Sequence, residues 1–299
     1  MFENKVSIEE NKTSVENLKI VEPSIHFNDF KDVRHILSST MRTKLLLSLY
    51  NNKKKLATLR DDLKKPSAAI LHGIKELEKN SLINKFDKYY CLSSTGYILA
   101  VNLLKLVEKW YSIEFNSDFW INQDISAIPP QYLKEIAIFK NAEYIISNEN
   151  DLTKALHEYL DMMAKTNNLK IILPIFSRVH LDAIIHKLDN NCNIELIIDE
   201  NILESINNNG YKKKLFKNSK DNEKRTNLKI LKVKENLNLF LTVSNDFISL
   251  SLFLEDGSYN DLNILIDKSK KAIDWGANVF DHYKKIASPL MFFDLTLIK

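Results

Sequence analysis

The order in which hydrophobic patterns follow one another between residues 33 and 115 constrains the fold of this chain more than any other feature. Apolar residues recur at helical spacing through residues 33–50, and a shorter helix is expected at 56–63. Pro66 then opens a third helix, for which Ser67 is the expected N-cap and Asn80 the expected end. Its buried face is expected to consist of three aliphatic residues, Ile70, Ile74 and Leu77.

Two β-type runs follow at residues 82–86 and 89–93, and the polar pair Asp87 and Lys88 between them predicts a hairpin turn. A long amphipathic helix is expected at residues 96–115. Three helices, a hairpin and a further helix are the order of a winged helix-turn-helix. The sequence therefore predicts this fold for residues 30–117.

The positive charge of the chain is concentrated in the same segment. Residues 31–95 contain 14 Lys and Arg against 6 Asp and Glu, a net charge of +8, whereas the whole chain carries +3 and the remainder therefore −5. Such asymmetry favours a polyanionic partner for the basic segment. Charge alone does not distinguish DNA from RNA or an anionic membrane surface, but together with the fold it predicts double-stranded DNA.

A winged helix inserts its third helix into the major groove and turns the outward face of that helix towards base edges. Ser67 is expected to donate to a base or a phosphate, and His72 to guanine. Ala68 and Leu71 are expected to contact thymine methyl groups, with partial packing against the core as the alternative for both. Lys75 and Lys79 complete this outward face.

Further side chains are expected to contact the phosphate backbone, because cations and hydroxyl groups flank the third helix. Lys64 and Lys65 lie in the turn between the second and third helices. The remaining candidates stand around the start of the second helix and beside the hairpin turn: Lys54, Thr58, Lys85 and Lys88.

Beyond a linker at residues 118–130, strands and helices alternate, which predicts an α/β domain with a largely parallel sheet. Residues 212–227 are expected to form a loop or a frayed helix. Strands are expected at 142–147, 169–176, 193–199, 228–233, 237–243 and 247–254, and helices at 133–140, 152–166, 178–188, 202–207 and 269–286.

Ligands of parallel sheets bind at the carboxyl ends of the strands. Phe176 and Ser177 end one expected strand, His180 follows them, and Ser244 ends another. These four residues are expected to bind a small-molecule effector, with helix capping as the alternative role of Ser177. The expected domains are a flexible arm at 1–29, a winged helix at 30–117 and an α/β sensor domain at 118–299.

No catalytic, metal or cofactor site is expected. The five Gly form no nucleotide-binding loop, and the seven His lack metal-ligand spacing. A phospholipase D site needs His-x-Lys and then Asp, but after His282 and Lys284 the required position is Pro289. Two distant Cys, no apolar leader and no spanning segment predict a cytoplasmic protein.

Several stretches carry the motifs of one regulator family. They are residues 38–49 (SSTMRTKLLLSL), 67–79 and 92–96 in the first domain, and 119–129, 252–259 (LFLEDGSY) and 272–283 in the second. With these motifs the chain resembles the two-domain winged-helix regulators of methanogenic archaea, which join a MarR/ArsR-like winged helix to a FilR-type sensor domain. Two departures are Ala68 and Ala69, where the family is richer in Ser and Thr, and Gln123, where it often has His.

The resemblance implies a transcriptional regulator that is not an enzyme, and a sensor domain similar in layout to non-catalytic phospholipase-D-like half-domains. A homodimer is expected through residues 96–115 and the first helix, because symmetric operators are read by symmetric dimers. Two alternatives remain open. One is a phosphodiesterase or nuclease-like enzyme that docks through the winged helix, and the other is a protein-interaction module in which the winged helix is a scaffold.

Overall fold

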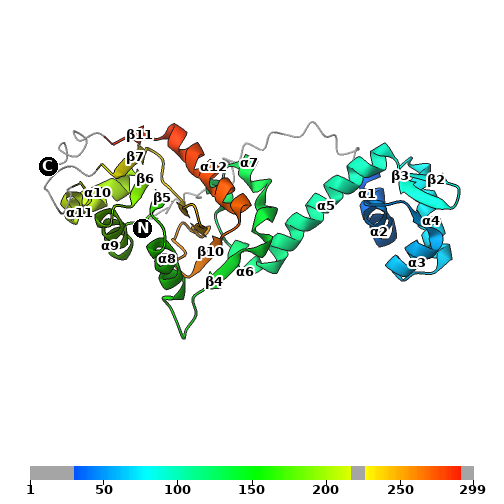
Figure 1. The fold of residues 1–299 in the computed structure, drawn as a ribbon, viewed down its shortest axis with the longest axis horizontal. Coiled ribbons are helices and arrows are strands. Elements are labelled where there is room, and N and C mark those ends of the chain that lie inside the picture. Colours follow the sequence, from blue (N-terminus) through cyan, green and yellow to red (C-terminus); the bar gives the residue numbers. More distant parts are fainter. Residues whose placement is uncertain (1–29, 217–225, 291–299) are drawn as a thin grey trace, which may run out of the picture. The chain divides into compact units, whose positions relative to one another are not determined.

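The computed structural model describes residues 30–216 and 226–290. These residues form two compact units that divide between Tyr111 and Ser112 (Figure 1). The division falls within one long helix, whereas the sequence placed a boundary after residue 117. The expected arm at residues 1–29 lies outside the described residues.

The first unit has the element order of a winged helix-turn-helix, as the hydrophobic patterns predicted (Figure 1). Its three-stranded sheet has the order β1-β3-β2, and both pairings are antiparallel. The elements are α1 (Phe30–Leu37), α2 (Thr40–Leu49), β1 (Lys54–Lys55), α3 (Leu56–Leu63), α4 (Ser67–Lys79), β2 (Ile83–Phe86), β3 (Tyr89–Leu92) and α5 (Ser94–Phe115).

Three helix boundaries differ from the prediction, of which the smallest difference is the start of α5 at Ser94 rather than at residue 96. The single helix expected at residues 33–50 is divided into α1 and α2, because Ser39 leaves the helical conformation and its Oγ caps α2 by accepting from the backbone N–H of Arg42 at 3.3 Å. Ser67 is not the N-cap of α4. Pro66 occupies that position with extended backbone, and Ser67 is the first helical residue.

The helices of the first unit pack closely because a glycine lies where α4 meets α2. A Cβ on Gly73 would lie 2.8 Å from Leu45 Cδ1, so a larger residue at this position would force that side chain to shift. The expected buried face of α4 is confirmed, since Ile70, Ile74 and Leu77 are at most 1% exposed. This packing leaves the opposite face of α4 at the surface.

The second unit contains an eight-stranded sheet with helices on both faces (Figure 1). The segment before the sheet forms α6 (Ser117–Trp120), η3 (Ile125–Ala127), α7 (Pro130–Leu133) and η4 (Ile136–Asn141). The strands are β4 (Glu143–Ile146), β5 (Asn168–Ile172), β6 (Asn193–Asp199), β7 (Leu228–Val233), β8 (Leu239–Val243), β9 (Ile248–Leu252), β10 (Asn263–Asp267) and β11 (Ser288–Pro289). The helices that follow α7 are α8 (Lys154–Ala164), α9 (Arg178–Asp189), α10 (Glu200–Asn208), α11 (Tyr211–Phe216) and α12 (Lys270–Ile286).

The expectation of a largely parallel sheet is wrong. The strand order is β11-β7-β6-β5-β8-β9-β10-β4, and only the pairings of β5 with β6 and of β6 with β7 are parallel among the described strands. The sheet differs because β8 pairs antiparallel with β5 and forms a hairpin with β9, and because β10 pairs antiparallel with both β9 and β4. The sequence analysis also missed β10. Of the loop expected at 212–227, α11 covers the start, and residues 217–225 lie outside the described part.

Alternating side chains of the sheet build two cores. Ile171 lies in the core beneath α8, α9 and α10, whereas its neighbour Ile172 lies in the core beneath α12. Gly276 lets α12 approach the second face, since a Cβ there would lie 2.5 Å from Ile248 Cδ1. Of the described helices, none is long and apolar enough to cross a membrane.

Candidate nucleic-acid interface and ligand pocket

A helix-turn-helix is formed by α3, a three-residue turn and α4 (Figure 1). Lys64 ends α3 in the left-handed conformation, with a φ of 50°, which reverses the chain towards Pro66. The side chains of Lys64 and Lys65 are exposed in this turn, and Thr58 is exposed on the first turn of α3. The structure therefore keeps three of the predicted phosphate contacts at the surface.

The outward face of α4 contains the predicted base-reading residues. Ala68, His72 and Lys75 are exposed, and Ser67 is half-buried. Leu71 is also half-buried and packs against the core of the first unit, so the alternative packing role applies at least in part to this residue. This face combines one cation, an imidazole, a hydroxyl and small apolar groups, which are the types of side chain that contact base edges.

Lys54 differs from the other predicted phosphate contacts because its ammonium is already paired. Its Nζ lies 2.6 Å from Asp62 Oδ2 and donates to Ser48 Oγ at 3.1 Å. Its neighbours Lys53 and Lys55 place their Nζ atoms 5.1 Å from the ring centre of Tyr89. The sequence predicted Lys54 as a phosphate contact, and spacing alone did not reveal its pair with Asp62.

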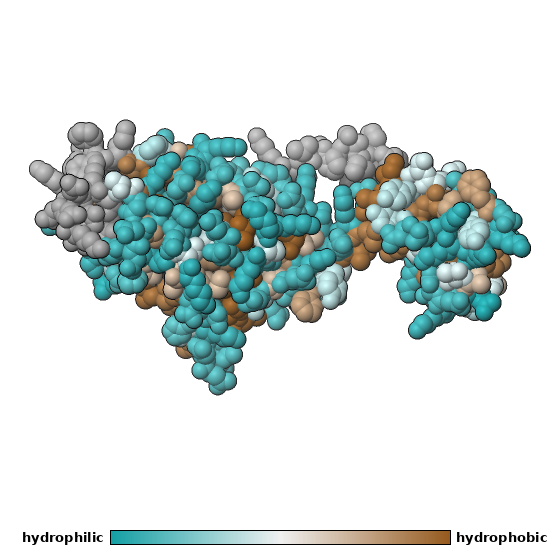
Figure 2. Space-filling view, viewed as in Figure 1, coloured by the Kyte–Doolittle hydropathy of each residue, from teal (hydrophilic) through white to brown (hydrophobic). Residues whose placement is uncertain are grey.

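The hairpin of β2 and β3 forms the wing. Asp87 has a φ of 53° in the two-residue turn, and Lys85, Phe86 and Lys88 are exposed around it. The Nζ atom of Lys85 lies 5.7 Å from the ring centre of Tyr90. Hydrophilic side chains cover much of the visible surface of this unit (Figure 2). The wing thus offers two cations beside an exposed aromatic ring.

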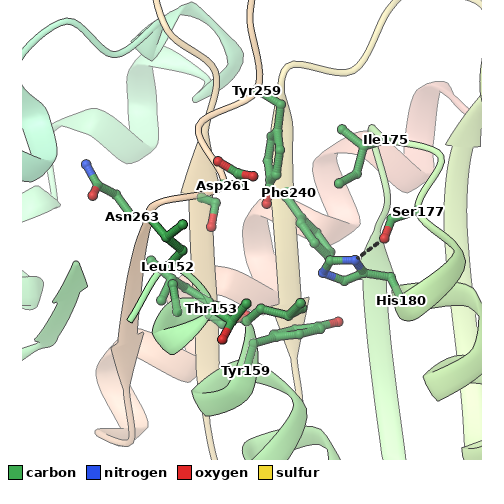
Figure 3. Close-up of a pocket in the computed structure, with 15 residues that line it drawn as sticks. Leu152, Thr153, Tyr159, Ile175, Ser177, His180, Phe240, Tyr259, Asp261 and Asn263 are labelled. Carbon is green, nitrogen blue, oxygen red and sulfur yellow. Dashed lines mark hydrogen bonds between the residues drawn. The ribbon is translucent and has the colours of Figure 1, made fainter. Parts of the chain in front are cut away.

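In the second unit, a cavity of about 290 Å³ lies beside α8, the start of α9 and strands β8 and β9. Of the four predicted ligand-binding residues, Ser177 and His180 line it, and the Nδ1 atom of His180 is 2.8 Å from Ser177 Oγ (Figure 3). His180 is 9% exposed, and burial lowers the pKa of its imidazole to about 4. The ring is therefore neutral at pH 7.

The other two predicted residues lie outside this cavity. Phe176 packs into the core, with its ring centre 5.9 Å from that of Tyr211. Because β8 runs antiparallel to β5, the carboxyl ends of these two strands point in opposite directions. Ser244, which follows β8, therefore lies at the other end of the strands from Ser177, which follows β5. Ser244 has a structural role there, since its Oγ accepts from the backbone N–H groups of Asp246 and Phe247 at 3.0 Å each.

Sequence reasoning missed most of the cavity wall. Tyr159 comes from α8, Phe240 from β8, and Tyr259 and Asp261 from the segment before β10 (Figure 3). The run Asn263–Asp267, with three consecutive aliphatic residues, was a signal for the missed strand. Recognising that strand would have placed the preceding segment beside the sheet.

Within residues 30–216 and 226–290, no group of three or more His, Cys, Asp or Glu is arranged to hold a metal ion. His282 and Lys284, the two residues of the His-x-Lys sequence, lie in α12. The ring of His282 packs against Tyr132, and Lys284 pairs with Glu195. These two side chains thus have structural contacts.

Comparison with known proteins gives matches to both units. Residues 30–109 match the N-terminal domain of methanogenesis regulatory protein FilR1, and residues 152–286 match its middle domain. The chain is 27% identical over 279 residues to the FilR1 protein of Methanothrix harundinacea (strain 6Ac). The match covers 90% of this chain and 60% of that relative, so the chain spans less than two thirds of its length.

Two solved structures share lower similarity. TrmBL2, an archaeal chromatin protein, is 12% identical to this chain. The match covers 87% of this chain and 100% of the TrmBL2 chain, with a TM-score of 0.36. The phosphatidylserine synthase of Haemophilus influenzae Rd KW20 is 13% identical to this chain. That match covers 50% of this chain and 39% of the synthase chain, also with a TM-score of 0.36. The sequence matches to both units decide the assignment: the chain belongs to the family of methanogenesis regulatory proteins related to FilR1.

Proposed function

We propose that this protein is a transcriptional regulator that binds double-stranded DNA through its winged helix. The exposed face of α4 carries the proposal, because Ala68, His72 and Lys75 stand outward on a helix whose other face is buried. Lysines of the turn and the wing flank that helix. Membership of a regulatory family supports the same role and favours binding over catalysis.

The proposed contacts divide into two classes. His72 donates to a purine and the methyl groups of Ala68 and Leu71 contact thymine, so these residues set sequence preference. Cations and a hydroxyl group contact phosphates and set affinity and its salt dependence. Ser67 contacts a base or a phosphate. Lys55 is proposed in place of Lys54, because the ammonium of Lys54 is paired with Asp62. The other proposed phosphate contacts are Lys64, Lys65, Thr58, Lys85 and Lys88.

The α/β unit acts as the sensor, and its cavity is the proposed effector site. A homodimer is part of the proposal, because α5 exposes a row of large apolar side chains. Leu106 is 56% exposed and Trp110 62%, and Val33 and Leu37 of α1 are also exposed. Contact with a second copy would remove such a surface from water.

Titration of the full chain into a labelled duplex tests the proposal. The duplex comes from the region upstream of its own gene, and an unrelated duplex measures nonspecific binding. At two or more salt concentrations, the double variant Lys85→Ala, Lys88→Ala is expected to reduce the slope of log K against log salt by about 2, because about one counterion is released for each phosphate contact.

The double variant Lys134→Ala, Lys154→Ala is the matched control, since it removes the same charge from exposed positions of the α/β unit. It should leave the slope unchanged. Absence of duplex binding at low salt would overturn the proposal. Equal losses in both double variants would overturn the assignment of phosphate contacts to the wing.

A further inference from the structure

The cavity of the α/β unit has a wall of four rings. Those of Tyr159, His180 and Phe240 form a cluster, with centres 5.0 to 5.4 Å apart, and Phe240 continues it to Tyr259 at 6.2 Å (Figure 3). Tyr159 and Phe240 are at most 5% exposed, so the core holds them in position. A neighbouring molecule would meet a continuous π surface.

Only one carboxylate lines the cavity. Of the described residues around it, Asp261 is the sole Asp or Glu, and no Lys or Arg lines it. In Figure 3 the carboxyl group of Asp261 lies beside the ring of Tyr259, and its charge contributes to raising the pKa of that phenol, for which burial is the main cause. No ion pair of Asp261 is present within the described ranges. Among the described residues, its negative charge therefore has no cationic partner.

The remaining polar groups of the wall are neutral. Ser177, Ser249 and Ser251 contribute hydroxyl groups, and His180 contributes an uncharged imidazole at pH 7. The hydroxyl group of Tyr159 forms a hydrogen bond with Thr242 Oγ1 at 3.1 Å. An anionic ligand would meet one carboxylate and no cation, whereas a cation would meet a carboxylate and aromatic rings.

We propose that this cavity binds a small organic ammonium ion, held against the rings of Tyr159, Phe240 and Tyr259 and paired with the carboxylate of Asp261. Aromatic rings attract alkylated ammonium groups through their negative faces, and this attraction increases as water is excluded. The volume of about 290 Å³ restricts the ligand to a small molecule. The inference rests on the proposed role of the α/β unit as a sensor.

Isothermal titration calorimetry on the full chain tests the inference with three probes of increasing bulk: tetramethylammonium, choline and benzyltrimethylammonium. The uncharged comparison is the dimethylbutanol isomer that is isosteric with choline, in which a tert-butyl group replaces the trimethylammonium group. Benzoate is the anionic comparison. At least one ammonium probe is expected to bind. Choline should bind about tenfold more tightly than its uncharged isostere, and benzoate should not bind.

Two matched variants locate the bound probe. Asp261→Asn should weaken ammonium binding about tenfold and leave the isostere unaffected, because it removes the charge and keeps the shape. Asp161→Asn is the control, since Asp161 is exposed on α8 and does not line the cavity. It should not change the affinity. Both positions are exposed, so both variants are expected to fold.

Three results would overturn the inference: no ammonium probe binds, the isostere binds as tightly as choline, or Asp261→Asn and Asp161→Asn have equal effects. Duplex titration of the same samples separates this inference from the proposed function. Loss of ammonium binding with DNA binding intact overturns the ligand class alone. Ammonium binding without DNA binding overturns the winged-helix proposal and leaves the ligand class standing.

Discussion

The Nδ1 atom of His180 lies 2.8 Å from the Oγ atom of Ser177, three residues earlier in the chain. Ser177 is at the N-cap of α9 and His180 is in its first turn, so the start of the helix itself brings the two side chains together. Ser177 Oγ makes no capping bond to the backbone and instead contacts the imidazole. The pair therefore contributes a hydroxyl group and an imidazole to the wall of the cavity.

Burial of His180 predicts a dependence of stability on pH. Its pKa is about 4 in the folded protein and near 6.5 when unperturbed, so between these values only the unfolded chain binds the proton. The stabilisation is complete above pH 6.5 and is lost as the pH falls towards 4, by roughly 3 kcal/mol in total. Urea unfolding of the wild type and His180→Gln at pH 7 and pH 4.5 measures this difference. Equal changes in unfolding free energy for both proteins would contradict the prediction.

The ion pair between Lys54 and Asp62 predicts unequal roles for neighbouring lysines. Lys54→Ala should change the affinity for duplex DNA by less than about twofold, because the ammonium it removes is already paired with a carboxylate. Lys55→Ala removes an exposed cation at the ring of Tyr89 and should weaken binding several-fold. Fluorescence anisotropy at low salt measures both. A larger loss for Lys54→Ala would show that this ion pair opens on DNA.

Gly276 predicts a stability effect at the contact of α12 with the sheet. Gly276→Ala places a methyl group 2.5 Å from Ile248 Cδ1 and 2.9 Å from Val243 Cγ2, and should cost about 1 to 3 kcal/mol of unfolding free energy. Adding Ile248→Val removes the nearer atom and should recover part of this loss, relative to Ile248→Val alone. Chemical denaturation of the four proteins measures the coupling. Additive effects would mean that the helix moves away without strain.

The exposed apolar row on α5 predicts the oligomeric state. Trp110→Glu introduces a charge at a side chain that is 62% exposed, so the folded unit should tolerate it, whereas a dimer interface should not. Sedimentation velocity should give a dimer for the wild type and a monomer for the variant. Lys105→Glu, at another exposed position of α5, is the control and should leave the dimer intact. The exposed Tyr97 is not used for this purpose, because its ring stacks on that of Tyr50 with a centroid distance of 5.1 Å. A monomeric wild type would remove the dimer from the proposal.

The winged helix could be predicted from the sequence because its information is local. The spacing of Ile70, Ile74 and Leu77 predicts both the helix and its buried side, and burial of these residues leaves His72 and Lys75 outward. The same local patterns predicted α8, α9 and the β8–β9 hairpin, with differences of a few residues at their ends.

Tertiary structure alone decided how the strands of the second unit pair, and therefore which residues share a site. Hydrophobic runs such as that of β8 fit either strand direction, since the alternation of side chains is the same in both. The antiparallel pairing of β8 with β5 separates Ser244 from Ser177, and the addition of β10 brings the segment containing Asp261 to the cavity. Contacts between distant segments determine these distances, and no short stretch of sequence contains them.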